Sequence, residues 1–442
     1  MDTIVLEPIN IAVIAPTGAG KTALISTICS YIEENSDKAD GYTLELESDA
    51  ARELNNFDVA VSNKLAGLNM KFESQALLPP TDGCDTYEFS MNFEDETSGI
   101  SVKQPFKVLD IPGKFINDRL GFKGDSAYNE FVKHLDHSRI LWIPIDTPIM
   151  MECNAPDERS LSDFIRCTTN LKHFAVEWAQ FAAKNKKIDY CNFVLIKSEK
   201  YFSQDILEQY QSELPTRFDQ AYGGIVKAMQ KQNKEDKISC VAVETIGAVK
   251  VGDVEWGDKN CKVEYIATGR EREIRGADCL LRDALFVAKS NVNDEIKIQV
   301  AAKENDRTRF AANLDNIIKE HEQNIMLLEI REQELGREEQ ELRNVEQQVK
   351  DASWWEKLKD TFGFGSLPEL KEKIRNLQAH RLSLSAEIKT GKAKIEDLRS
   401  RRDDTKMCIS NIDTEISALK KVIVWFDNLS CGNIDSRYYR NL

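Results

Sequence analysis

Apolar and polar residues follow two different rhythms along this chain of 442 residues. In the first part, short apolar runs alternate with amphipathic stretches such as Leu161–Lys184, which has the spacing of a helix. Four apolar runs predict buried strands: Ile9–Ile14, Ile140–Asp146, Phe193–Ile196 and Ile238–Val243. Alternation at Tyr87–Met91 predicts a half-buried strand. This order predicts an α/β domain over residues 1–290, with a mostly parallel sheet, helices on both faces and a closing helix at Ala277–Ala288.

From about residue 291 the apolar positions instead repeat every seven residues. Two arms of about 60 residues, 291–350 and 369–428, carry this heptad pattern, which is typical of a coiled coil. At 1.5 Å per residue each arm is on the order of 90 Å long. Pro368 marks the start of the returning arm. Because the linker 351–368 is short, we predict an antiparallel helical hairpin within one chain, followed by a C-terminal tail at 429–442.

Two stretches make the first domain longer than a minimal one, at about 35–78 and 247–275. In the second, Trp256-Gly257-Asp258-Lys259-Asn260 predicts a hairpin turn between two alternating strands. Both stretches border the segments with candidate chemistry. They are therefore expected to carry partner contacts or to be surface elaborations.

A glycine-containing segment joins the first strand to a helix-compatible stretch, and it reads Ala15-Pro16-Thr17-Gly18-Ala19-Gly20-Lys21-Thr22. This is the pattern of a P-loop, with Ala15 at the position where glycine is usual. Its backbone N–H groups can surround phosphate, Lys21 can reach the β- and γ-phosphates, and Thr22 can bind Mg²⁺. The segment predicts that the chain binds a nucleoside triphosphate.

A second segment decides between classes of P-loop protein. An apolar strand ends at Asp110, which can hold Mg²⁺ through water, and Gly113 follows where its N–H can meet the γ-phosphate. This D-x-x-G pattern is that of GTPases, whereas ATPases of the SMC and ABC type have glutamate at the position of Ile111. Thr81 is the candidate threonine that closes over the metal, with Thr86 in reserve.

In these motifs the first 290 residues resemble the translation-factor-related class of P-loop GTPases, and the layout is similar to that of dynamin-like and septin-like proteins. The resemblance implies GTP and Mg²⁺ as ligands, Thr22, Thr81 and Asp110 around the metal, and Lys21, Thr81 and Gly113 as catalytic residues.

The class reads guanine with an Asn/Thr-Lys-x-Asp segment after a buried strand. Lys197 and Glu199 stand at that place, and a final base-contacting loop is expected at Glu244-Thr245-Ile246-Gly247. Ile196 departs from the family pattern, and Glu199 is one methylene longer than the family's aspartate. ATP therefore remains an alternative to GTP.

The residues expected for hydrolysis depart from the family as well. Lys114 stands where Ras-type enzymes have a water-orienting glutamine, and Thr17 lies near the place of a catalytic glutamine in dynamin-like proteins. Missing groups can be supplied by a second subunit or an activator. We expect a slow switch or mechanochemical GTPase that is stimulated by self-association through the α/β domain or the helical hairpin, and whose nucleotide state is transmitted to the hairpin. The alternative is a nucleotide-binding scaffold of a multiprotein assembly, such as a defence assembly, with little hydrolysis.

The linker between the two arms carries five large apolar side chains beside lysines: Trp354, Trp355, Leu358, Phe362 and Phe364. Such a cluster suits a membrane surface or a protein partner, and the alternative is that it folds back to cap the hairpin.

Composition limits the remaining possibilities. A net charge of −15 argues against nucleic acid as the main partner. The ten cysteines form no C-x-x-C pair, so reduced structural thiols are expected. No apolar stretch approaches 18 residues, and the start Met1-Asp2 lacks a basic segment. We expect a cytoplasmic protein, either free or peripheral at a membrane.

Overall fold

The computed structural model describes most of the chain. The described residues are 3–36, 42–56, 71–73, 85–95, 100–117, 122, 124–152, 158–185, 189–202, 207–233, 237–256, 261–268, 273–352, 354–362, 366–428 and 439–442. They form two compact units, the first made of residues 1–296 and 421–442 and the second of residues 297–420.

A large mixed sheet forms the centre of the first unit, with the strand order β12-β9-β8-β7-β2-β6-β5-β3 and β1 also on β6. Its strands are β1 (Thr3–Val5), β2 (Ile9–Val13), β3 (Tyr42–Leu46), β5 (Asp85–Asp95), β6 (Ile100–Asp110), β7 (Ser138–Asp146), β8 (Tyr190–Ile196), β9 (Lys237–Ala242) and β12 (Tyr439–Asn441). The strands from β9 to β6 run parallel, whereas β5, β3 and β12 pair in antiparallel fashion. The predicted α/β domain with a mostly parallel sheet is confirmed.

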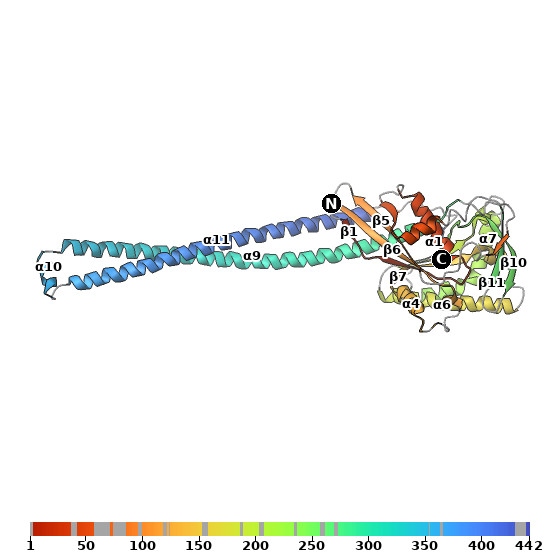
Figure 1. Ribbon diagram of the computed structural model, residues 1–442, viewed down its shortest axis with the longest axis horizontal. Coiled ribbons are helices and arrows are strands. Elements are labelled where there is room, and N and C mark those ends of the chain that lie inside the picture. The colour runs from red at the N-terminus through yellow and green to blue at the C-terminus, as the bar shows by residue number, and fades with distance from the viewer. Residues whose placement is uncertain are drawn as a thin grey trace. The chain divides into compact units, whose positions relative to one another are not determined.

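Helices cover both faces of this sheet, with α1 on the opposite side from α4 and α6 (Figure 1). The helices are α1 (Lys21–Glu34), α3 (Lys114–Asn117), α4 (Ser126–His137), α5 (Thr147–Glu152), α6 (Glu158–Asn185), α7 (Leu207–Ala221) and α8 (Gly223–Gln232), with a 3₁₀ turn at Glu199–Phe202. Local chemistry fixes some of their ends. The Asp125 carboxylate, for example, caps α4 by accepting hydrogen bonds from the N–H groups of Ala127 and Tyr128, at 2.8 and 3.2 Å.

A second, three-stranded sheet combines the two long insertions, in the order β10 (Val249–Trp256), β11 (Cys261–Ala267) and β4 (Lys71–Glu73). β10 and β11 are antiparallel, with Trp256 opposite Cys261, so the predicted hairpin is confirmed. Its turn lies outside the described residues. The antiparallel pairing of β11 with β4 was not predicted. Tyr265 of this inserted sheet packs in one apolar cluster with Ala23 of α1.

Two long helices, α9 (Ala277–Asp351) and α11 (Leu367–Asn428), follow the sheet, and a short helix, α10 (Trp354–Thr361), lies between them in sequence. The helix predicted at 277–288 is confirmed, but it does not end at Ala288, because α9 continues without a break into the first heptad arm. No proline or glycine stands between Gly276 and Gly336 to end it.

In the second unit, α9 and α11 run side by side in opposite directions (Figure 1). Residue numbers rise along α9 while those of their ion-pair partners fall along α11. The pairs are Lys303–Glu415, Arg307–Asp413, Glu320–Lys394, Glu332–Lys392 and Glu341–Lys373. All of these groups are solvated, so each pair contributes little free energy and mainly favours this register. Between the helices lies an apolar seam that includes Leu342, Leu384 and Leu398.

Both long helices also contribute to the first unit. Asn291 of α9 donates to Gln104 Oε1 of β6 at 3.0 Å. Near the end of α11, the ring of Phe426 packs edge-on against Phe93 of β5, with 4.8 Å between centroids. The segment expected as a C-terminal tail also ends in this unit, because β12 pairs with β9.

The short helix α10 leaves two large apolar side chains in solvent. Trp354 is 65% exposed and Phe362 is 70% exposed, while Leu358 is partly buried. The side chain of Trp355 and all of Phe364 lie outside the described part of the chain. Across the described residues, none of the helices has both the length and the apolar character needed to span a bilayer.

Candidate functional site

The candidate residues gather at the carboxyl end of β2. The chain passes from β2 to β6 on one side of it and then to β7 on the other side, so the direction of winding reverses at β2. In open α/β sheets, ligands bind in the crevice outside the strand ends at such a switch point. The loop that leaves β2 there, residues 14–20, is called the glycine loop below.

Two glycines give the glycine loop its shape. Gly18 and Gly20 have φ values of 81° and 94°, in the left-handed region that side chains disfavour. Gly20 is also covered closely, because a Cβ at this position would lie 2.5 Å from Ile196 Cδ1. The loop therefore needs glycine for its backbone conformation, and its Gly20 packs against the end of β8.

Lys21, the first residue of α1, folds back over the glycine loop. Its side chain is buried, and Nζ donates to the carbonyl oxygens of Ala15 and Pro16 at 3.2 and 3.4 Å. Burial lowers the pKa of Lys21, while the nearby Asp110 acts in the opposite direction. The ammonium is thus held against the loop at a helix N-terminus, where an anion is favoured.

Thr22 and Asp110, 88 residues apart in sequence, are in direct contact. The Thr22 hydroxyl donates to Asp110 Oδ2 at 2.6 Å, and Asp110 is fully buried at the end of β6. A hydroxyl beside a carboxylate is a donor set that suits Mg²⁺, which also keeps waters and takes oxygens from phosphate.

The described residues show no further candidate metal ligands beside Thr22 and Asp110. Within the described residues, no three His, Cys, Asp or Glu side chains converge as a metal site. Thr81 lies outside the described residues. Its reserve, Thr86, stands near the start of β5, opposite Leu109, with an exposed side chain.

Gly113 lies against the glycine loop. A Cβ at this position would lie 2.3 Å from the backbone nitrogen of Thr17, so only glycine fits without a shift of the backbone. Lys114 begins α3 with an exposed side chain, and its Nζ lies 5.9 Å from the ring centroids of Phe115 and Phe122. The structure therefore brings Thr17, Thr22, Asp110 and Gly113 together.

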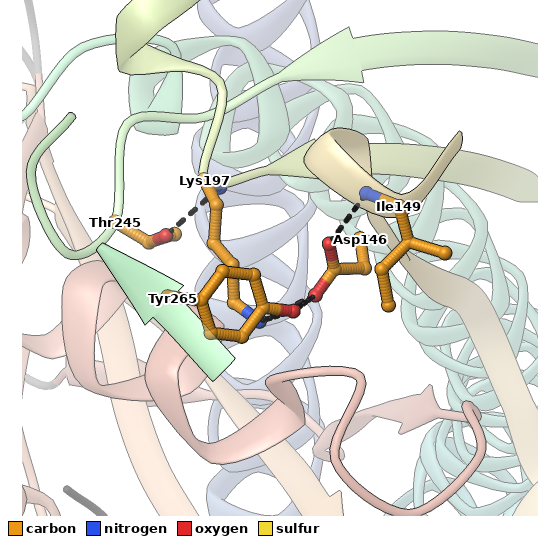
Figure 2. A network of polar contacts seen from close by, with 5 residues as sticks. All are labelled: Asp146, Ile149, Lys197, Thr245 and Tyr265. Atoms are coloured by element: carbon orange, nitrogen blue, oxygen red, sulfur yellow. Dashed lines mark hydrogen bonds and ion pairs between the residues drawn. The ribbon is translucent and has the colours of Figure 1, made fainter. Parts of the chain in front are cut away.

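Lys197 lies in a buried polar network with Asp146, Thr245 and Tyr265 (Figure 2). Its backbone is left-handed, with φ of 58°, and its N–H donates to Thr245 Oγ1 at 3.1 Å. Its ammonium donates to Asp146 Oδ2 and, at 2.9 Å, to the Tyr265 hydroxyl, which itself donates to Asp146. Three chain segments are thereby joined around one ammonium.

Glu199 is also fully buried, and it holds the loop after β9. Its Oε1 accepts hydrogen bonds from the N–H groups of Thr245, Ile246 and Gly247 at 2.5, 2.8 and 2.9 Å. Burial raises the pKa of Glu199 to about 7, and the nearby Glu244 raises it as well. The hydrogen bonds from the loop N–H groups lower it. The expected roles of Lys197 and Glu199 toward guanine stay predictions.

Two members of this region were missed in the sequence. Asp146 ends a buried strand beside β2, and the rule that singled out Asp110, a carboxylate at a strand end, would have found it as well. Tyr265 shares one face of its strand with the apolar residues Val263 and Ala267. This pattern indicates that Tyr265 is buried but gives no sign of its polar partners.

Comparisons with known proteins identify no relative of this chain. The chain matches no family model, and no curated protein matches it. The functional assignment therefore depends on the residues of the site alone.

Proposed function

We propose that this protein binds a nucleoside triphosphate with Mg²⁺ in the glycine loop and hydrolyses it slowly, as a switch of the GTPase type. In this proposal the backbone of residues 15–20 surrounds the phosphates and Lys21 neutralises the β- and γ-phosphates. Thr22 and Asp110 hold the metal, directly and through water. Gly113 offers its N–H to the γ-phosphate, and Thr81 closes over the metal.

One observation carries the proposal, namely the contact of Thr22 with Asp110 beside the close approach of Gly113 to Thr17. Each motif is short and can arise by chance. Their convergence at one switch point, from segments about 90 residues apart, supports a common role. GTP is the nucleotide that the family resemblance favours, and ATP is the alternative.

A response of the long helices to the nucleotide is part of the same proposal. β5 and β6 pair along their whole length, with Asp85 opposite Asp110 at the end near the site. Farther along the same pair, Phe93 packs on Phe426 of α11, and Gln104 accepts from Asn291 of α9. A shift of these strands at Asp110 can therefore reach α9 and α11 through these two contacts.

The proposal is tested by Lys21→Ala, with binding followed by a fluorescent GTP analogue and folding by circular dichroism. We expect a folded variant without measurable triphosphate binding, because the charge on the β- and γ-phosphates is lost. Lys227→Ala is the matched control, since Lys227 is an exposed lysine on α8. Unchanged affinity in folded Lys21→Ala would contradict the phosphate assignment.

A nucleotide-binding scaffold with little hydrolysis is the second candidate. It is favoured by Lys114, an exposed lysine at the position where a water-orienting glutamine would be expected. Phosphate release by the purified protein, measured over a range of protein concentrations, separates the two. Release that rises with self-association supports the switch, and its absence at every concentration supports the scaffold.

A further inference from the structure

The segment Lys197-Ser198-Glu199 directs both of its charged groups into the protein. The Lys197 ammonium lies between Asp146 and Tyr265 (Figure 2), and Glu199 Oε1 accepts from three consecutive backbone N–H groups. Ser198 is buried too, and its hydroxyl donates to the carbonyl of Val243 at 3.2 Å. All three side chains are therefore bonded to other parts of the first unit.

These bonds connect the segment to two other parts of the first unit. Glu199 and the Lys197 N–H hold the loop 244–247, and Lys197 Nζ holds Tyr265 of the inserted sheet. Lys197 of this segment and Ile196, the residue before it, also lie against the glycine loop, because a Cβ on Gly20 would lie 3.7 Å from Lys197 Cε and 2.5 Å from Ile196 Cδ1. One short segment thus contacts the glycine loop, the loop 244–247 and the inserted sheet.

Reading a base with Glu199 would require this arrangement to open, because the residue is fully buried and neither of its carboxylate oxygens faces solvent. A guanine edge offers two donor groups, N1–H and the N2 amine, to a carboxylate. The buried Oε1 already accepts three amides, and releasing them would leave buried donors unpaired, which is costly.

We propose that Lys197-Ser198-Glu199 is an internal brace that positions the glycine loop, with Tyr265 as its anchor in the inserted sheet, and that it does not read the base. This inference rests on the proposed function and specifies its substrate class: nucleoside triphosphates, with little discrimination at the base. Lys197, Glu199 and Tyr265 are positioning residues that act through the loops they hold.

The first test is competition by GTP, ATP and xanthosine triphosphate against one fluorescent triphosphate analogue on the full-length protein. A site that reads a base through buried hydrogen bonds discriminates by about 10⁴-fold or more, whereas a brace leaves the three affinities within about tenfold. A preference above about tenfold for any one of the three would overturn the brace. Failure of all three to bind would overturn the proposed function, and the inference with it.

The second test is Glu199→Gln, which replaces the carboxylate by an amide of the same shape. Xanthine has a carbonyl in place of guanine's N2 amine, so a glutamine that faces the base gains a donor–acceptor match with xanthine and loses one with guanine. The brace predicts that the affinities for GTP and xanthosine triphosphate fall by one common factor, about tenfold. A switch of preference toward xanthosine triphosphate would show that residue 199 touches the base, and would overturn the brace.

The third test is Tyr265→Phe, which removes only the hydroxyl bonded to Lys197 and Asp146. We expect a common loss of affinity for all three triphosphates of about three- to tenfold. Tyr210→Phe is the matched control, because the buried Tyr210 hydroxyl has no hydrogen-bond partner within the described residues. Unchanged affinities in folded Tyr265→Phe would overturn the anchor role, and thermal unfolding checks that each variant is folded.

Discussion

The two units of this protein bring their residues together in different ways. In the first unit, Thr22 meets Asp110, and Lys197 meets Tyr265, across long sequence separations and in partly or fully buried surroundings. In the second unit, the partners on α9 and α11 follow from a regular repeat, and their charged groups are solvated. The comparison teaches that the same kind of substitution should have very different effects in the two units.

Glycine to alanine gives the largest expected contrast. In Gly113→Ala the new methyl group overlaps the backbone of Thr17, so the glycine loop must shift. We expect triphosphate affinity to fall by about 100-fold, measured by fluorescent-nucleotide titration. In Gly336→Ala, on α9, the methyl group meets open space, and we expect the free energy of unfolding to rise by about 0.5–1 kcal/mol with unchanged binding.

The contrast would fail if Gly113→Ala bound nucleotide normally. That result would mean that the close approach of Gly113 to the loop has no part in holding phosphate.

Leucine to alanine tests the seam of the second unit. Leu384 is 1% exposed between α9 and α11, whereas Leu382, on the same helix, is 66% exposed. We expect Leu384→Ala to lower the free energy of unfolding by about 2–3 kcal/mol, through lost burial and the cavity left behind. Leu382→Ala should change it by no more than about 0.5 kcal/mol. Equal effects in denaturant unfolding, followed by circular dichroism, would contradict the observed pairing of the helices.

The buried carboxyl of Glu199 makes the stability of the first unit depend on pH. Burial raises its pKa to about 7 in the folded state, above the value in the unfolded chain. At pH values between the unfolded and the folded pKa, the folded protein therefore keeps a proton on Glu199 that the unfolded chain has released. Stability from this group is fully present below the unfolded pKa and is lost as pH rises through about 7.

Between pH 5 and pH 8 the loss is on the order of 2–3 kcal/mol. We expect Glu199→Gln, which has no such proton, to gain stability relative to the natural chain over this range. His134, whose pKa is lowered by burial, changes stability in the opposite direction, and the comparison with Glu199→Gln subtracts its effect. Urea midpoints at the two pH values provide the measurement, and parallel changes in both proteins would contradict the raised pKa.

The smallest effect on stability is expected in the linker between the two long helices, at and next to α10. Because Trp354 and Phe362 are mostly solvated, their replacement by serine should change the free energy of unfolding by no more than about 0.5 kcal/mol. A larger loss would indicate that they cap the hairpin. Vesicle flotation and partner pull-down then separate the two proposed contacts, with Leu382→Ser as an exposed control on α11. Loss of flotation alone supports a membrane surface, and loss of a partner alone supports a protein contact.

Much of the architecture could be predicted because it depends on residue patterns within single short segments. Apolar runs predicted β2, β7, β8 and β9, and alternation predicted the hairpin of β10 and β11. The pairing of β11 with β4 was not foreseen, since strand pairing between two distant insertions leaves no local pattern. The continuity of α9 was missed for a different reason, namely that a domain boundary was expected at a change of composition where no helix-breaking residue stands.

By itself, the sequence determined the α/β order, the heptad arms and the residues of the glycine loop, because each depends on spacing within one segment or on the conformational freedom of glycine. Only the tertiary structure decided which distant groups meet. It placed Asp110 on Thr22, Gly113 against Thr17, and the ammonium of Lys197 between Asp146 and Tyr265. The physical reason is that a buried charge must be neutralised by whatever partner the packing brings to it, and packing depends on the whole sheet, not on a single segment.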